Sequence, residues 1–130
     1  MTVHMTPAVV LISDEPERLA RFYAKLTGGQ LKASPGSEVV DVLAPQGSCI
    51  TVRRDDEAIP TTWPAPTGSQ PVRLLIYVAA DDLDEAERDA VSEGATPMEV
   101  VNVAADVEAR SFADPSGNAF VIAARDDLAA

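Results

Sequence analysis

The sequence predicts an α+β fold made of two βαβββ repeats that form a curled eight-stranded mixed sheet around a concave pocket, with one helix per repeat on the outer face. The order strand, helix, three strands occurs twice along the 130 residues. The glycines that end elements repeat as well, because Gly28 and Gly94 each follow an expected helix, and Gly47 and Gly117 each precede an expected last strand. One such half leaves a sheet face uncovered, so two halves are expected to share a concave face.

The first repeat is expected over residues 7–54. Residues 8–12 (AVVLI) are short and β-branched, which favours a strand. Asp14 is expected to be the N-cap of a helix, whose apolar residues recur at helical spacing until two glycines at 28–29 end it. Three more strands are expected at residues 30–33, 38–43 and 48–53.

Residues 55–71 are expected to connect the repeats, because prolines interrupt any periodicity there. The second repeat, residues 72–124, then follows the same order. A helix is expected from Asp81 to residue 93, with an apolar stripe that includes Val91. Its strands are expected at residues 72–78, 97–103, 107–113 and 118–124. The chain is therefore interpreted as one domain of two repeats.

Charge and composition limit the classes of partner. The chain has 21 acidic and 10 basic residues, a net charge of −11, so neither nucleic acid nor an anionic membrane is an expected partner. No stretch approaches the roughly 20 apolar residues of a membrane span. The one cysteine, Cys49, cannot form an internal disulfide, and residues 1–7 lack the features of a signal peptide. A cytoplasmic location is expected.

Alternation along the strands assigns side chains to the two faces of the sheet. The face beneath the helices is expected to be uniformly apolar: Ala8, Val10, Ile12, Ile50, Val52, Val72, Leu74, Ile76, Val78, Phe120 and Ile122. The opposite face is expected to be mixed: Cys49, Thr51, Arg53, Arg73, Leu75, Tyr77, Ala119, Val121 and Ala123. Apolar walls with a few polar groups are typical of a ligand cavity.

Four segments resemble the vicinal oxygen chelate superfamily, which contains glyoxalase I, extradiol dioxygenases and bleomycin-resistance proteins. These are SDEPERLARFYAKLTGG (13–29), TWP (62–64), DDLDEAERDAVSEGA (81–95) and FADPSGNAFVI (112–122). The last is the most specific, because DPxGN followed by alternating apolar residues closes the final strand in these proteins. The short chain with TWP resembles the glyoxalase-like proteins common in actinobacteria. The resemblance also implies a homodimer.

The resemblance implies a divalent metal bound by the first and last strands of each half. Carried over by motif, the ligand positions fall on Pro7 or its neighbours, on Thr51, on Arg73 and on Val121. Proline and valine have no ligand atom, threonine is a weak neutral ligand, and arginine would repel a cation. The only histidine, His4, lies before the expected position and is interpreted as a surface residue. Neither a metal nor another cofactor is therefore expected.

Arg73 is the first candidate for ligand binding, since a guanidinium among apolar neighbours can hold a carboxylate, phosphate or enolate oxygen. The alternative is an ion pair with Asp41 or Glu99. Trp63 is expected either to stack on a ligand or to anchor the connector. Arg110 faces the cavity or the solvent, because the strand's ends are not fixed by the pattern.

Four further residues of the mixed face are candidates. Tyr77 offers a hydroxyl to a ligand or fills the core, and Cys49 is either a nucleophile or a small buried residue. Thr51 and Arg53 complete the expected ligand-binding set.

The function expected is that of a small-molecule-binding protein of the glyoxalase/bleomycin-resistance type, without metal-dependent catalysis. Arg73 favours a ligand that is anionic or oxygen-rich. The alternative is a metal-dependent lyase, isomerase or dioxygenase-type enzyme, and a third possibility is a remnant whose pocket is filled by Leu75, Tyr77 and Val121.

Overall fold

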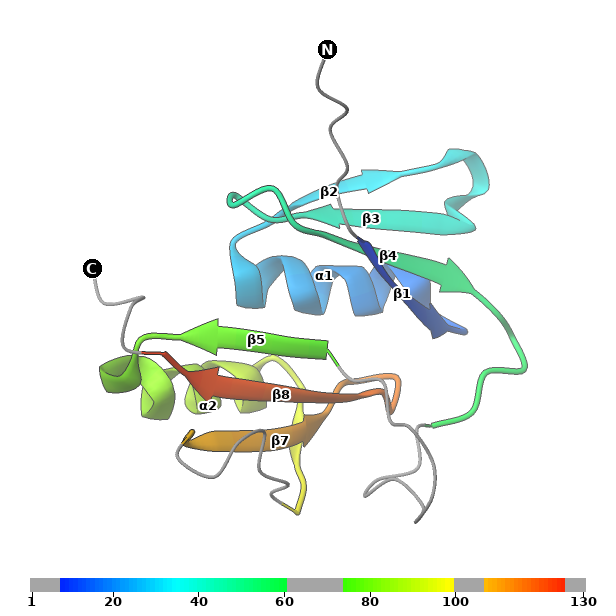
Figure 1. The fold of residues 1–130 in the computed structure, drawn as a ribbon. Coiled ribbons are helices and arrows are strands. Elements are labelled where there is room, and N and C mark those ends of the chain that lie inside the picture. The colour runs from blue at the N-terminus through cyan, green and yellow to red at the C-terminus, as the bar shows by residue number, and fades with distance from the viewer. Residues whose placement is uncertain (1–7, 61–73, 100–106, 126–130) are drawn as a thin grey trace. The chain divides into compact units, whose positions relative to one another are not determined.

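A computed structural model describes residues 8–60, 74–99 and 107–125, and Figure 1 shows its fold. The chain divides into two compact units, residues 1–58 and residues 59–130. Each unit contains one α-helix and four strands among the described residues, in the order strand, α-helix, three strands, together with one short 3-10 helix. This confirms the predicted α+β class and the two βαβββ repeats.

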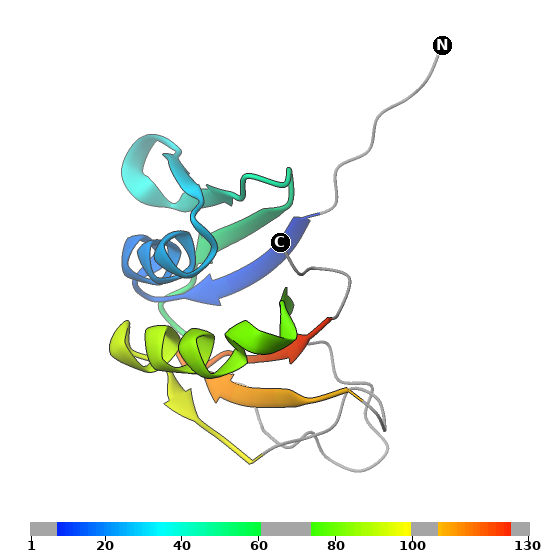
Figure 2. The ribbon, with the colours of Figure 1, turned by 90° about the vertical axis from the view of Figure 1, so that its left-hand side faces the viewer.

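The first unit contains β1 (Ala8–Ser13), α1 (Pro16–Thr27), β2 (Gln30–Ala33), β3 (Val39–Leu43) and β4 (Cys49–Arg54). Its strands form a four-stranded sheet in the order β1-β4-β3-β2. The first and last strands, β1 and β4, pair in parallel, while the other pairs are antiparallel. Figure 2 shows α1 lying along one face of this sheet.

The second unit contains β5 (Leu74–Val78), α2 (Leu83–Ser92), β6 (Thr96–Pro97), β7 (Ala109–Ala113) and β8 (Ala119–Ala124). Its sheet order, β5-β8-β7-β6, repeats the topology of the first unit, with β5 and β8 parallel. Of the strand expected at 97–103, the described part shows β6 over Thr96–Pro97 and no strand at residues 98–99, and residues 100–103 lie outside the described part. No helix in the described residues is long and apolar enough to cross a membrane.

The start of α1 differs from the prediction. Asp14 does not cap the helix: Glu15 takes the N-cap position, without a side-chain cap hydrogen bond. Instead, the Ser13 hydroxyl oxygen accepts from the Glu15 backbone N–H at 2.9 Å, and Pro16 begins the first turn. The helix ends as expected at Gly28, whose φ of 72° suits a residue without a side chain.

Each helix packs through a few apolar side chains. In α1, Leu19, Phe22 and Tyr23 are buried at the expected spacing. In α2, Leu83 and Ala90 are buried, whereas Val91 is 44% exposed, so its assignment to the apolar stripe was wrong. The reason is geometric, because Val91 lies about 100° around the helix from Ala90 and faces away from the sheet.

The predicted faces of the first strand were wrong, while those of the second unit are confirmed for the described strand residues, since Leu74 pairs with Phe120, Ile76 with Ile122 and Leu75 with Val121. Val72 and Arg73 lie outside the described residues. The register of β1 with β4 places Val9 beside the buried Ile50 and Leu11 beside the buried Val52. Ala8, Val10 and Ile12 therefore share the opposite face with Cys49, Thr51 and Arg53. Every residue of AVVLI is apolar, so alternation contains no signal for its direction.

Asp114 holds the turn between β7 and β8. Its Oδ1 accepts hydrogen bonds from the backbone N–H groups of Ser116 and Asn118, both at 2.9 Å, and the residue is buried. The equivalent turn of the first unit has the same backbone bonds, with Ala44 in place of the aspartate. The conserved turn geometry therefore has a side-chain acceptor in one unit only.

Asp114→Ala is expected to lower the free energy of unfolding by about 2 kcal/mol, because two partly buried N–H donors lose a charged acceptor. Chemical denaturation of the purified protein measures the effect. Ala44→Asp is the matched variant: it adds the same acceptor to the equivalent turn and should not destabilise. Equal stability of Asp114→Ala and the wild type would contradict this account of the turn.

Candidate functional site

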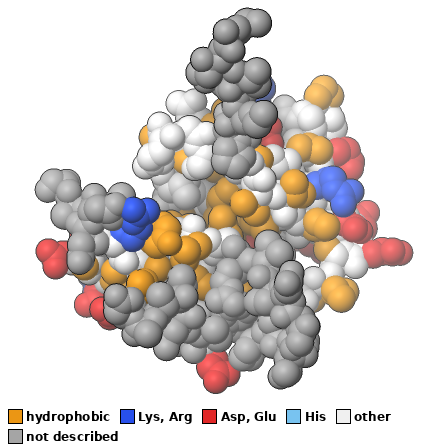
Figure 3. Space-filling model, viewed as in Figure 1, with side chains coloured by type: hydrophobic (Ala, Val, Ile, Leu, Met, Phe, Trp, Pro, Cys, Tyr) orange, Lys and Arg blue, Asp and Glu red, His pale blue; other side chains and the backbone are white. Residues whose placement is uncertain are grey.

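Each sheet has one face without a helix. In the first unit, α1 lies on the face of the buried Val40, Val42, Ile50 and Val52, and we call the other face the α1-distal face. Cross-strand register gives its central members: Ala8, Val10, Ile12, Lys32, Val39, Asp41, Leu43, Cys49, Thr51 and Arg53. It combines exposed apolar side chains, Val10 among them, with polar ones. Hydrophobic side chains appear among the surface atoms in Figure 3.

A short polar chain crosses the α1-distal face. The Thr51 hydroxyl donates to Asp41 Oδ1 at 2.8 Å, and the two residues are direct cross-strand partners. Cys49 Sγ lies 3.8 Å from the same hydroxyl oxygen. All three side chains are partly buried, so they can offer hydrogen bonds to a molecule lying on this face. Arg53, the next residue of the face along β4, is exposed.

The side chains around Cys49 do not favour a role as a nucleophile. A reactive cysteine needs a nearby cation or base to stabilise the thiolate. The polar contact described for Cys49 is a neutral hydroxyl that is already bonded to a carboxylate. The geometry is that of a small, partly buried side chain in a polar chain.

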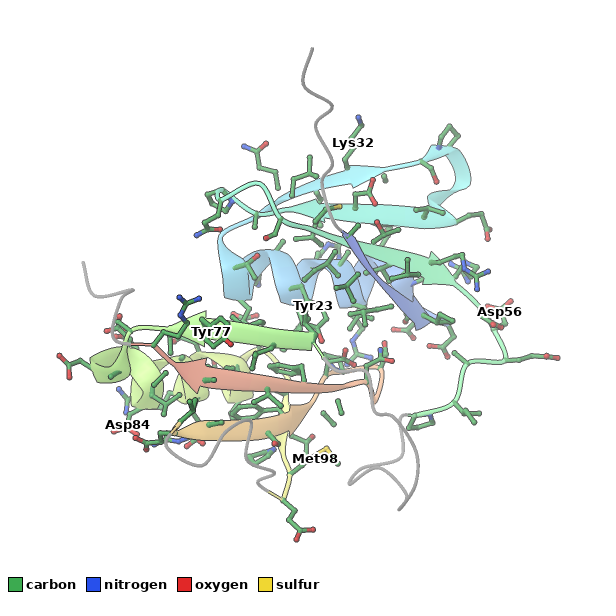
Figure 4. All side chains as sticks on the ribbon, in the orientation of Figure 1. Tyr23, Lys32, Asp56, Tyr77, Asp84 and Met98 are labelled. Carbon is green, nitrogen blue, oxygen red and sulfur yellow. The ribbon has the colours of Figure 1, made fainter. Side chains whose placement is uncertain are left out.

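In the second unit, α2 lies on the face that carries Arg110. The Arg110 guanidinium contacts the α2 carboxylates of Asp84 at 2.7 Å and Glu87 at 3.6 Å, and also Glu108 at 3.5 Å. The hydrogen bond that Arg110 donates to the Asp84 carboxylate is the main reason that the pKa of Arg110 is raised. Of the two alternatives left open by the sequence, the cavity is excluded, because Arg110 lies on the helix-covered face. There it pairs at the surface with carboxylates that are 40–74% exposed, and Asp84 is labelled in Figure 4.

The opposite face of this sheet, which we call the α2-distal face, contains Tyr77. Register places Tyr77 beside Ala123, and the Arg125 guanidinium carbon lies 4.8 Å above the centre of its ring. Tyr77 is 40% exposed, so it does not fill a core. A cation over the ring leaves the hydroxyl end available for a ligand. Arg73 and Trp63, the other predicted residues of this half, lie outside the described residues.

Sequence reasoning missed Ser111 as a candidate. It lies on the α2-distal face opposite Val121, is 2% exposed, and its Oγ has no hydrogen-bond partner in the part of the chain that the structure describes. An unpaired buried hydroxyl costs about 1–3 kcal/mol, so it needs an explanation. The signal that would have found it is the alternation from Ala109 to Ala113, once the strand ends are known.

The residues at the expected metal positions do not fit a divalent ion. The hydroxyl proton of Thr51 is held by Asp41, and Val121 is fully buried among apolar side chains. Pro7 and Arg73 lie outside the described residues, and their types supply no metal ligand. Across residues 8–60, 74–99 and 107–125, no three His, Cys, Asp or Glu side chains gather into a candidate metal site.

Comparison with known proteins agrees with this fold. The family model of the glyoxalase-like domain matches residues 8–123. A glyoxalase/bleomycin resistance protein/dioxygenase family enzyme from Burkholderia phytofirmans PsJN has 18% identity and a TM-score of 0.68, covering 90% of this chain and 95% of that one. The fosfomycin resistance protein FosX from Listeria monocytogenes has 14% identity and a TM-score of 0.71, covering 95% of both chains. No curated protein matches the sequence.

The fold is therefore that of the glyoxalase/bleomycin-resistance/dioxygenase superfamily. The chain belongs to the glyoxalase-like domain family, whose model spans nearly the whole sequence. At 14–18% identity, the two solved structures establish the fold alone.

The hydrogen bond between Thr51 and Asp41 is expected to contribute about 1 kcal/mol to stability. A double-mutant cycle with Thr51→Val and Asp41→Ala measures it, since each single variant removes the hydrogen bond and the cycle isolates the coupling of the pair. Denaturant unfolding of the four proteins should show that the second substitution costs less when the first is present. Strictly additive effects would mean that the pair contributes no coupling.

Proposed function

We propose that the protein binds a small organic molecule and does not catalyse a metal-dependent reaction. The proposal rests on the side chains at the two expected metal positions in the last strands of the repeats, Thr51 in β4 and Val121 in β8. Thr51 already donates its proton to Asp41, and Val121 lies in a cluster with Ala109 and Ala123. Neither position can supply the carboxylate that the resemblance implies for a metal-binding relative.

The α1-distal and α2-distal faces favour a partly apolar ligand. Both combine apolar side chains with a few polar ones, among them Thr51 and Asp41 on the first face and Tyr77 and Ser111 on the second, which is the composition of small-molecule sites. Arg73, by its place in the sequence, remains the proposed partner of an anionic or oxygen-rich group. Trp63, Tyr77, Thr51, Cys49 and Arg53 complete the proposed binding set.

Two further parts of the proposal concern the setting of the protein. The family resemblance supports a homodimer, and the net charge of −11 does not favour nucleic acid or an anionic membrane as a partner. With one cysteine and no possible internal disulfide, a cytoplasmic location is proposed.

A metal-dependent enzyme is the second candidate. It is favoured by one neighbour, FosX, which has also been described in complex with Mn(II) and sulfate ion, with 13% identity and a TM-score of 0.71. In this chain, the Asp41 carboxylate is the one acidic group of the α1-distal face among the described residues. A single carboxylate bonded to a hydroxyl is a poor site for a transition metal.

Metal addition distinguishes the two candidates. The melting temperature is expected to stay unchanged when Mn²⁺, Ni²⁺ or Zn²⁺ is added, because a ligand raises it only by binding the folded state. Native mass spectrometry of protein purified without an affinity metal column should show no stoichiometric metal. A saturable rise in melting temperature, lost in Asp41→Asn, would support the enzyme instead.

Arg73→Ala is expected to abolish retention of any anionic small molecule that copurifies with the wild type, because a paired guanidinium bond to an oxyanion is lost. Native mass spectrometry detects the retained mass and also gives the oligomeric state. Arg18→Ala is the matched control, since Arg18 is an exposed α1 residue paired with Glu15. Equal retention by all three proteins would remove the anionic ligand from the proposal.

A further inference from the structure

The turns that precede the last strands of the two units share one backbone geometry. In the first unit the Gly47 N–H donates to the Ala44 carbonyl oxygen at 2.9 Å, and in the second unit the Gly117 N–H donates to the Asp114 carbonyl oxygen at the same distance. The φ angles of the two glycines are 93° and 87°, in the region that residues with a side chain rarely adopt. Both turns therefore have the same local reason for a glycine.

The surroundings of the two glycines differ. A Cβ atom added at Gly47 would have no atom within 4 Å. A Cβ atom added at Gly117 would lie 2.8 Å from Cβ, 3.1 Å from Cγ and 3.2 Å from Cα of Pro60. Carbon atoms pack at about 3.5–4.0 Å, and a proline ring cannot rotate away, so this contact leaves no room for a side chain. Gly117 therefore has a second reason to be glycine, which Gly47 lacks.

The turn that Pro60 contacts is also the turn with additional side-chain hydrogen bonds. Asp114 Oδ1 accepts from the N–H groups of Ser116 and Asn118, which flank Gly117, both at 2.9 Å. The equivalent turn of the first unit has alanine in place of this aspartate. The backbone on both sides of Gly117 is thus fixed by one carboxylate, so the surface that Pro60 contacts is well defined.

The two described residues that flank the segment 61–73 both lie at the start of β8. Pro60 is the last described residue before this segment, and Leu74 is the first one after it. Pro60 contacts Gly117, which precedes β8 by two residues, and Leu74 pairs with Phe120 in β8. Both ends of the segment are therefore held by neighbouring positions of the second unit.

We propose that the β7–β8 turn is a docking platform for the connector, with Pro60 and Gly117 as the positioning pair that holds the connector there. The inference goes beyond the proposed function, because the contact does not depend on any ligand. Trp63, a proposed ligand-binding residue, follows three residues after Pro60 in the sequence. Since three residues span at most about 11 Å, a fixed Pro60 limits where Trp63 can lie. Only this last consequence rests on the proposed function.

A set of glycine variants tests the contact by thermal unfolding of the full chain. Gly117→Ala should lower the melting temperature by about 4 °C more than Gly47→Ala, because both place alanine at a positive φ and only Gly117→Ala also meets Pro60. In the Pro60→Gly background, the two alanine substitutions should lower the melting temperature equally. An excess effect of Gly117→Ala that persists without the proline ring would overturn the proposal.

The motion of the connector provides a second, spectroscopic readout. Trp63 is the one tryptophan of the sequence, so its time-resolved fluorescence anisotropy reports nanosecond motion close to Pro60. The amplitude of this motion should rise in Gly117→Ala and in Pro60→Gly, without a further rise in the double variant, and Gly47→Ala should match the wild type. A further rise in the double variant would mean that the two residues act independently, which contradicts the docking platform.

Pro60→Gly keeps the test decisive if Gly117→Ala does not fold, because it alters neither sheet. Pro66→Gly is its matched control, since it removes a proline three residues on the other side of Trp63. Pro60→Gly should increase the motion of Trp63 more than Pro66→Gly does, and an equal effect of the two would overturn the proposal. None of these outcomes touches the proposed function, which fails separately if the purified protein carries stoichiometric metal.

Discussion

The parallel pairing of the first and last strands of each repeat is the constraint on which the rest of each unit depends. A chain that leaves β1 and returns in parallel as β4 must cross over, and its helix then lies on one face of the sheet. β5 and β8 repeat this arrangement around α2. Because each unit has one helix, the other face of each sheet is left to other contacts. Both candidate surfaces follow from this one topological requirement.

Much of the fold could be predicted because the relevant residues differ strongly in character. In β8, Phe120 and Ile122 alternate with alanines and Val121, so the two faces could be assigned correctly. The strand AVVLI has no such contrast, and its faces were assigned wrongly. Hydrophobic alternation therefore locates a strand in both cases but orients it only when large and small, or polar and apolar, residues alternate.

The candidate site was less predictable, because it depends on pairs of residues far apart in the sequence. Thr51 was a candidate from the strand pattern, yet its bond to Asp41 follows from the β3–β4 register. Ser111 was missed for the same reason. Its hydroxyl has no hydrogen-bond partner among the described residues, because the residue opposite it in the β7–β8 register, Val121, has no polar side-chain atom. The face on which Arg110 lies could not be assigned from the sequence, because the residue at which the strand begins was not known. The strand β7 covers Ala109–Ala113, so Arg110 and Ser111 lie on opposite faces of the sheet.

The two units have kept one topology and diverged in how they satisfy polar groups. The first unit pairs Thr51 with Asp41 but has Ala44 at its last turn. The second unit places Asp114 at that turn, and its Ser111 hydroxyl has no partner among the described residues. The small side chains around Ser111 are buried as well, Val121 and Ala123 completely, so this face of the second sheet is packed. The α1-distal face of the first sheet, in contrast, exposes Val10 and Leu43. The same topology therefore gives one unit an exposed mixed face and the other a buried apolar one.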